Sequence, residues 1–98
     1  MTFAEFREST IQPRPPASLT PALLALWHDG RADWEAAHKV AQDIDGPDGA
    51  WIHAYLHRKE GDLANAGYWY RRAGKPECRD SLESEWASIV SAMLAAPS

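Results

Sequence analysis

Two histidines and a glutamate in the central segment have a spacing that suits metal binding. His53 and His57 are four residues apart, and Glu60 follows three residues later. In a helix, side chains at this spacing lie on one face. Imidazoles with a carboxylate one turn on can hold a transition metal and leave a coordination position open. The His-Glu-x-x-His signature is absent, because residues 54–56 are Ala-Tyr-Leu. A metal-binding protein or metal-dependent enzyme using His53, His57 and Glu60 is one hypothesis.

A second interpretation gives His57 a structural role. His28 has the same surroundings in the first half of the chain, and Asp33 and Asp62 follow the two histidines at the same offset of five. A neutral buried imidazole needs a partner for each ring nitrogen, or it loses about 1–3 kcal/mol for each unmet group. We therefore expect each histidine to hydrogen-bond the aspartate of its own copy, or the backbone around it, and so to stabilise the turn.

A stripe of interface-forming residues runs along another face of the same segment. Trp51, Tyr55 and Arg58 are spaced at i, i+4 and i+7, and Leu26 precedes His28 as Tyr55 precedes His57. Tryptophan, tyrosine and arginine are the residue types that anchor interfaces. This pattern predicts a small non-enzymatic interaction module. Its partner would be a protein or peptide segment, or a second copy of the chain in a homo-oligomer.

The alternative is that this face is filled from within the chain. Phe3, Phe6 and the proline-rich segment that follows them would then lie across it, and the stripe would belong to the core. Five tryptophans are more than a domain of 98 residues readily hides, so we expect some of them to be partly exposed.

A basic and aromatic cluster and a single cysteine are the remaining candidates for chemistry. The cluster consists of Tyr68, Trp69, Arg71, Arg72 and Lys75. Such a cluster can stack on a nucleic-acid strand, but the net charge of −4 argues against that partner. Cys78 lies among cations, as reactive thiols do, yet no histidine is near it in sequence. We expect no nucleic-acid partner, no catalytic cysteine and no cofactor.

Two helices joined by a tight turn must position these residues. Residues 50–74 predict one helix up to Glu60 and another from about residue 63, with Gly61 ending the first and Asp62 capping the second. Ala54 and Ala66 are small enough for the two helices to cross closely.

This segment resembles a tetratricopeptide repeat. The matching residues are Ala54, Gly61, Asp62, Ala66, Tyr70 and Ala73. The resemblance implies an antiparallel helical hairpin whose first helix lines a concave peptide-binding surface. Trp51 falls one position away from the family's tryptophan, and Cys78 stands where the family has its closing proline.

An internal repeat extends the resemblance to the first half of the chain. The shift that carries His28 onto His57 also aligns residues 24–28 with 53–57, Asp33 with Asp62 and Ala37 with Ala66. The period is shorter than the usual 34 of this family. Two tetratricopeptide-like hairpins are therefore expected.

Helix-capping and helix-breaking residues predict the remaining elements. Thr2 and Glu5 form a capping box before a short helix over about residues 3–8, and three prolines make residues 11–18 an extended arm. Further helices are expected over residues 21–29, 33–44 and 81–95, with a break at 45–49 and a cap at Asp80. The apolar stripe of the last helix predicts a capping helix over the exposed side of the second hairpin.

The sequence thus predicts an all-α fold. Residues 1–19 form a short helix and a proline-rich arm, and residues 20–98 form a single helical-repeat domain. One cysteine gives no internal disulfide, the net charge disfavours an anionic membrane, and no apolar run suits a bilayer span or signal peptide. A cytoplasmic protein with no membrane partner is expected.

Overall fold

The computed structural model describes residues 1–96, and every regular element in that part of the chain is a helix. The helices are α1 (Phe3–Ser9), α2 (Pro21–Gly30), α3 (Trp34–Ala41), α4 (Gly46–Glu60), α5 (Leu63–Ala73) and α6 (Leu82–Ala95). The predicted all-α class is confirmed. None of these helices, over the residues described, is long and apolar enough to cross a lipid bilayer.

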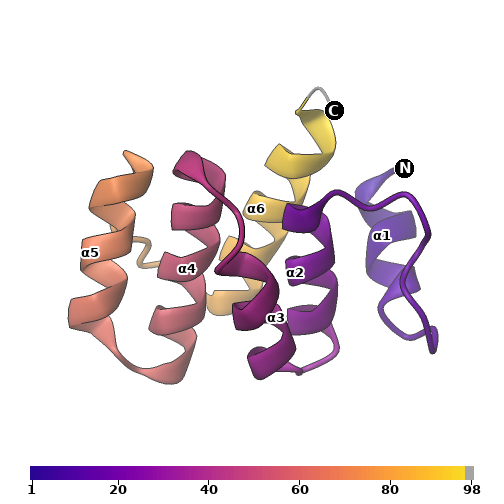
Figure 1. Cartoon of the computed structure of the whole chain (residues 1–98), viewed down its shortest axis with the longest axis horizontal. Helices are drawn as coiled ribbons and strands as arrows, with labels where there is room; N and C mark the ends of the chain where they lie inside the picture. The colour runs from indigo at the N-terminus through magenta and orange to yellow at the C-terminus, as the bar shows by residue number, and fades with distance from the viewer. Residues whose placement is uncertain (97–98) are drawn as a thin grey trace.

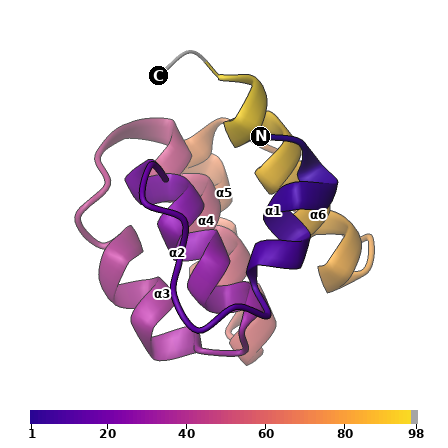
Figure 2. The same cartoon turned by 90° about the vertical axis from the view of Figure 1, so that its right-hand side faces the viewer.

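The helices form two antiparallel pairs, and α6 and α1 pack against them as two additional layers. The helix α2 packs against α3, and α4 packs against α5 (Figure 1). The helices α2 and α4 occupy the middle of the molecule, with α3 on one side and α6 on the other (Figure 2). The helix α1 contacts both α2 and α6. The two sides of the α2–α4 layer are therefore different environments, one covered by α6 and one flanked by α3.

Small residues occupy the crossings, as predicted. Ala54 and Ala66 are buried together with Tyr70 in one core cluster. Ala25 and Ala37, which correspond to Ala54 and Ala66 in the first pair, are fully buried. Close approach of the two helices in each pair follows from the short side chains at these positions.

The turns of the two pairs are built differently. Gly61 and Gly74 end α4 and α5 in the left-handed conformation, with φ of 90° and 70°. In the first pair the left-handed residue is Ala32, with φ of 63°, at the position equivalent to Gly61. Asp33 and Asp62 cap the helices that follow, each accepting a backbone N–H three residues on.

Three predicted boundaries are wrong. The helix α4 begins at Gly46, because Pro47 lies in the first turn, where a helix needs no N–H from it. The helix α3 ends at Ala41 and does not reach residue 44. Ser81, and not Asp80, caps α6, and its side chain accepts the N–H of Ser84 at 3.0 Å.

The proline-rich arm is irregular, and its start is tied to the end of α2. The indole N–H of Trp27 donates to the Ser9 carbonyl at 3.0 Å. Arg31 donates to the carbonyls of Thr10 and Gln12. Phe6 is fully buried in the main core, so α1 packs as part of the same body as the later helices.

The apolar stripe of α6 closes the core across both helical pairs. Its buried apolar residues are Trp86, Ile89, Val90 and Met93. The indole N–H of Trp86 donates to the Leu26 carbonyl at 3.0 Å. The expected position over the exposed side of the second pair is therefore wrong, since α6 packs on α2 and α4. That position buries the apolar faces of two helices at once.

Candidate functional site

The predicted partner face lies under α6. Leu26 is fully buried and Tyr55 is 2% exposed, both in the main core cluster. The hydroxyl of Tyr55 donates to Asp29 Oδ2 at 2.7 Å, and Lys59 Nζ donates to Asp29 Oδ1 at 2.9 Å. The prediction that Leu26 and Tyr55 lie on an exposed partner face is therefore wrong, because α6 covers the face that they form.

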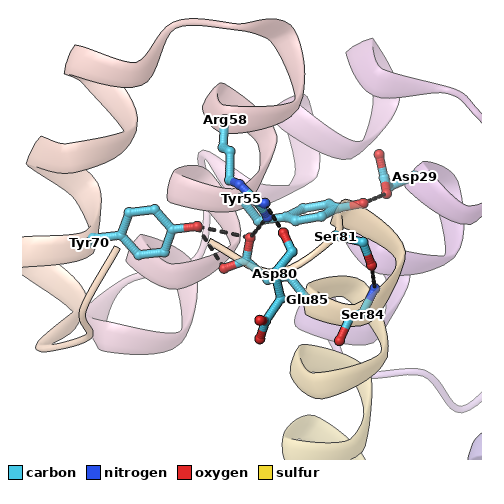
Figure 3. Close-up of polar contacts among 8 residues, drawn as sticks. All are labelled: Asp29, Tyr55, Arg58, Tyr70, Asp80, Ser81, Ser84 and Glu85. Carbon is cyan, nitrogen blue, oxygen red and sulfur yellow. Dashed lines mark hydrogen bonds and ion pairs between the residues drawn. The ribbon is translucent and has the colours of Figure 1, made fainter. Parts of the chain in front are cut away.

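An acidic residue of α6 fixes this arrangement (Figure 3). Glu85 is buried, and its Oε1 accepts from Arg58 Nη1 at 2.8 Å. The hydroxyl of Tyr70 lies 2.8 and 2.6 Å from the two carboxylate oxygens of Glu85. Arg58 also donates to the Asp80 carbonyl, just before the start of α6. The α6 carboxylate thereby joins α4 to α5.

The filling of the predicted face comes mainly from α6. Phe3 and Phe6 pack against Trp86, each with ring centroids 5.9 Å apart. Trp51 stays half-buried, with Lys75 Nζ 4.3 Å from the centre of its ring. The expected partial exposure of some tryptophans is confirmed at Trp34, Trp51 and Trp69.

On the α3 side of the molecule, a third histidine joins the two found in the sequence. His38 of α3 lies against His53 and His57 of α4, with ring centroids 5.2 and 5.4 Å away. One ring nitrogen from each histidine lies within 4.8 Å of the other two. A tetrahedral zinc site with Zn–N bonds of 2.0–2.1 Å has its nitrogens about 3.3 Å apart. The three nitrogens would have to move closer together to bind one ion at that spacing.

Two tryptophans hold the imidazole rings in place. Trp34 stacks on His38 with ring centroids 4.8 Å apart, and Trp69 stacks on His53 at 4.3 Å. The indole N–H of Trp34 donates to the Leu56 carbonyl at 2.8 Å, which fixes that ring on α4. The histidines therefore lie between walls supplied by α3 and α5.

The outer nitrogens of two of the rings have partners of the kind found around bound metals. Glu60 Oε1 lies 2.8 Å from His57 Nδ1, which leaves Nε2 of His57 free to bind an ion. The Gln42 amide lies 3.2 Å from His38 Nδ1, and an amide can serve either tautomer. His53 is 7% exposed, and its Nδ1 is buried without a hydrogen-bond partner among the described residues.

Burial favours the neutral form of two of these imidazoles, because it lowers the pKa of His53 and of His38. Burial lowers the pKa of His53 to about 4, helped by the neighbouring His38 and His57. A contact with the Ala41 backbone opposes this shift in the pKa. Burial also lowers the pKa of His38, helped by His57 and opposed by Glu60. A neutral imidazole is the form that binds a metal ion.

The chain matches no protein-family model, no curated protein and no solved structure. Its geometry therefore carries the functional argument.

One of the three predicted metal ligands, Glu60, does not lie among the histidine ligands of the cluster. His53 and His57 are in the cluster, but Glu60 bonds the outer nitrogen of His57. Glu60 is therefore placed to orient a ligand. A second group, formed by His57, Glu60 and Asp62, also has its atoms within 4.8 Å of one another, although both carboxylates are exposed.

The predicted pairing of histidines with aspartates does not form between side chains. Among the residues described, His28 makes no side-chain hydrogen bond to Asp33, and His57 bonds Glu60 in place of Asp62. The two copies instead share one backbone hydrogen bond. Asp33 N donates to the His28 carbonyl, and Asp62 N donates to the His57 carbonyl. Within residues 1–96, His57 lies in a cluster with other histidines, and His28 does not.

The spacing of His53 and His57 along one helix gave no indication of His38. It belongs to the preceding helix, on the other side of the helix break predicted at residues 45–49. The packing of one hairpin against the other, which places α3 beside α4, is the feature that could have indicated His38. Of the other candidates, Arg72 donates to the Tyr68 hydroxyl at 2.9 Å, and Cys78 is half-buried against the Ala54 cluster.

Proposed function

We propose that this chain binds a divalent transition metal ion of the zinc class through His38, His53 and His57. The observation that carries the proposal is the cluster itself, in which one ring nitrogen from each of the three histidines lies within 4.8 Å of the other two. Imidazole suits zinc and copper, whereas calcium and magnesium require oxygen ligands.

We further propose that the scaffold is a divergent pair of tetratricopeptide-like hairpins. The support is the internal repeat that aligns His28 with His57, together with the small residues at both crossings. In this scaffold the three ligands come from both pairs, because His38 belongs to the first and the other two to the second. Metal binding would therefore connect the two repeats.

Equilibrium dialysis of the full chain against Zn²⁺ tests the metal-binding proposal. We expect one Zn²⁺ per chain and a rise in the unfolding temperature. At a free ion concentration 100 times Kd, the gain in unfolding free energy is about 2.7 kcal/mol. His38→Ala and His53→Ala should each abolish stoichiometric binding.

His28→Ala is the matched control, because His28 lies outside the cluster. It should bind Zn²⁺ as the unchanged chain does. Equal loss of binding in His28→Ala and His38→Ala would contradict the proposal, as would the absence of stoichiometric binding by the unchanged chain.

The interaction-module hypothesis is the second candidate. Its support is the strip left half-exposed at Trp51 and Arg58, beside a cavity of about 320 Å³ between Trp51 and the loop around Cys78. Native mass spectrometry of the protein taken from its own host would test it. A stoichiometric protein partner lost on Trp51→Ala would favour this hypothesis, and a metal ion without any partner would count against it.

A further inference from the structure

A cavity of about 250 Å³ lies directly beside the histidine cluster. His53 and Gln42 form its wall on the cluster side, Trp69 and Arg72 form the α5 side, and the first turn of α4 closes one end. His53 belongs to both features, since one of its ring nitrogens lies in the cluster and the residue also lines the cavity.

The charges around this cavity include a cation with no carboxylate partner. The Arg72 guanidinium lies 5.3 Å from the centre of the Trp69 ring, and it donates one hydrogen bond to Tyr68. Over residues 1–96, no carboxylate lies within ion-pair distance of Arg72. The first turn of α4 adds the positive end of a helix dipole. Among the described residues, Asp45 is the one acidic residue that lines this cavity. It belongs to the segment before α4, whereas Arg72 belongs to α5.

An ion held by three histidines keeps at least one coordination position for an outside ligand. We propose that a small carboxylate enters this cavity, completes the coordination of the ion and pairs with Arg72. This inference rests on the proposed metal binding. A carboxylate has two oxygens, so one can bind the ion while the other accepts from the guanidinium, a charge-assisted pairing that an uncharged ligand cannot make.

The size of the cavity restricts the ligand to a small molecule. A volume of 250 Å³ holds roughly eight water molecules at about 30 Å³ each. The stacked rings of Trp69 and His53 form one rigid wall, and Pro47 contributes another. A short-chain carboxylate fits this space.

Cobalt substitution tests the inference with the full chain. Co²⁺ takes the place of zinc and reports its coordination sphere through its visible absorption. We expect Co²⁺ to bind one per chain and acetate to change the spectrum in a saturable way. Arg72→Ala should weaken acetate binding by about tenfold, the effect of one lost charge-assisted hydrogen bond, and leave Co²⁺ affinity unchanged.

Arg71→Ala is the matched control, because Arg71 is exposed on the same helix and does not line the cavity. It should leave acetate affinity unchanged. If Co²⁺ binds and acetate leaves the spectrum unaltered, or if Arg72→Ala and Arg71→Ala behave alike, the carboxylate site is refuted and metal binding stands. Failure of Co²⁺ and Zn²⁺ to bind at all overturns both proposals.

Discussion

At the scale of single residues, the partners of the three imidazoles decide what the cluster can do. His53 has an unpaired nitrogen among the described residues, His57 has a carboxylate partner and His38 has an amide. A purely structural cluster would gain stability by pairing the His53 nitrogen, because an unmet buried group is destabilising. Under the proposed metal binding, each ring supplies one nitrogen lone pair to the ion.

Glu60→Gln should weaken Zn²⁺ binding by about tenfold, while the protein stays folded. A carboxylate that accepts from the outer nitrogen of a ligating histidine raises the basicity of that histidine, and its loss typically lowers affinity 10–100-fold. Glutamine keeps the hydrogen-bond acceptor and removes the charge. Isothermal titration calorimetry with Zn²⁺ measures the change.

Asp62→Asn is the control for this prediction. Asparagine also caps helices well, so α5 should be unaffected. If Asp62→Asn lowers the affinity as much as Glu60→Gln, and His38→Ala does not lower it, the ion is bound by the group of His57, Glu60 and Asp62.

At the scale of elements, the two turns test how backbone conformation limits stability. Ala32 holds a left-handed conformation that costs an alanine about 1–2 kcal/mol, whereas Gly61 holds the same conformation without strain. Ala32→Gly should therefore raise the unfolding free energy by about 1 kcal/mol, after part of the gain is offset by the freedom of glycine in the unfolded chain. Denaturant unfolding monitored by tryptophan fluorescence measures the change.

Gly61→Ala is the reciprocal variant and should lower the unfolding free energy by about 1 kcal/mol. A Cβ at Gly61 would meet no atom within 4 Å, so the change isolates backbone strain. Opposite signs for the two variants are required, and a destabilised Ala32→Gly would contradict the prediction.

A buried carboxylate contributes to the attachment of α6. Glu85→Ala should lower the unfolding free energy by about 3 kcal/mol, because it leaves the Arg58 charge and the Tyr70 hydroxyl without their partner. Glu83→Ala is the control on the same helix, because the Glu83–Arg7 pair is exposed and contributes at most about 1 kcal/mol. Similar losses in the two variants, measured by denaturant unfolding, would show that the buried network does not fix α6.

At the scale of the whole molecule, two buried tyrosines connect helices across the core. Tyr55 of α4 donates to Asp29 of α2, and Tyr70 of α5 donates to Glu85 of α6. Burial raises the pKa of Tyr55, with the Asp29 carboxylate adding to the shift. Burial and the hydrogen bond to Glu85 raise the pKa of Tyr70 in the same direction.

These shifts predict unfolding at alkaline pH. The folded protein keeps both phenols protonated, whereas tyrosine in the unfolded chain releases its proton near pH 10. The stabilisation is therefore complete below about pH 10 and is lost as pH rises above that value, by about 1.4 kcal/mol per pH unit for each tyrosine. Denaturant unfolding at increasing pH, with phenolate absorbance as a second signal, measures the slope.

Tyr55→Phe should reduce this slope, because phenylalanine carries no titrating proton. Tyr68→Phe is the control, since Tyr68 is exposed and lies outside both networks. An equal slope in Tyr55→Phe and the unchanged chain would rule out Tyr55 as a source of the alkaline instability.

The sequence by itself determined the local features of this protein. The helix class, the end of α4 at Gly61, the Asp62 cap and the small residues at the crossing were all predictable. Each depends on residues within one helix or one hairpin, where backbone sterics and hydrogen bonds act over a few positions. The His53–His57 pair was visible for the same reason.

Only the tertiary structure decided where the separate elements pack. An apolar stripe shows that α6 must be covered, but not by which surface, since burial of apolar area has no direction. Its position on α2 and α4 buried Leu26 and Tyr55, which the sequence had placed on a partner face. The approach of α3 to α4 brought His38 to His53 and His57. Contacts between residues of different elements depend on that packing, and the histidine cluster exists because of it.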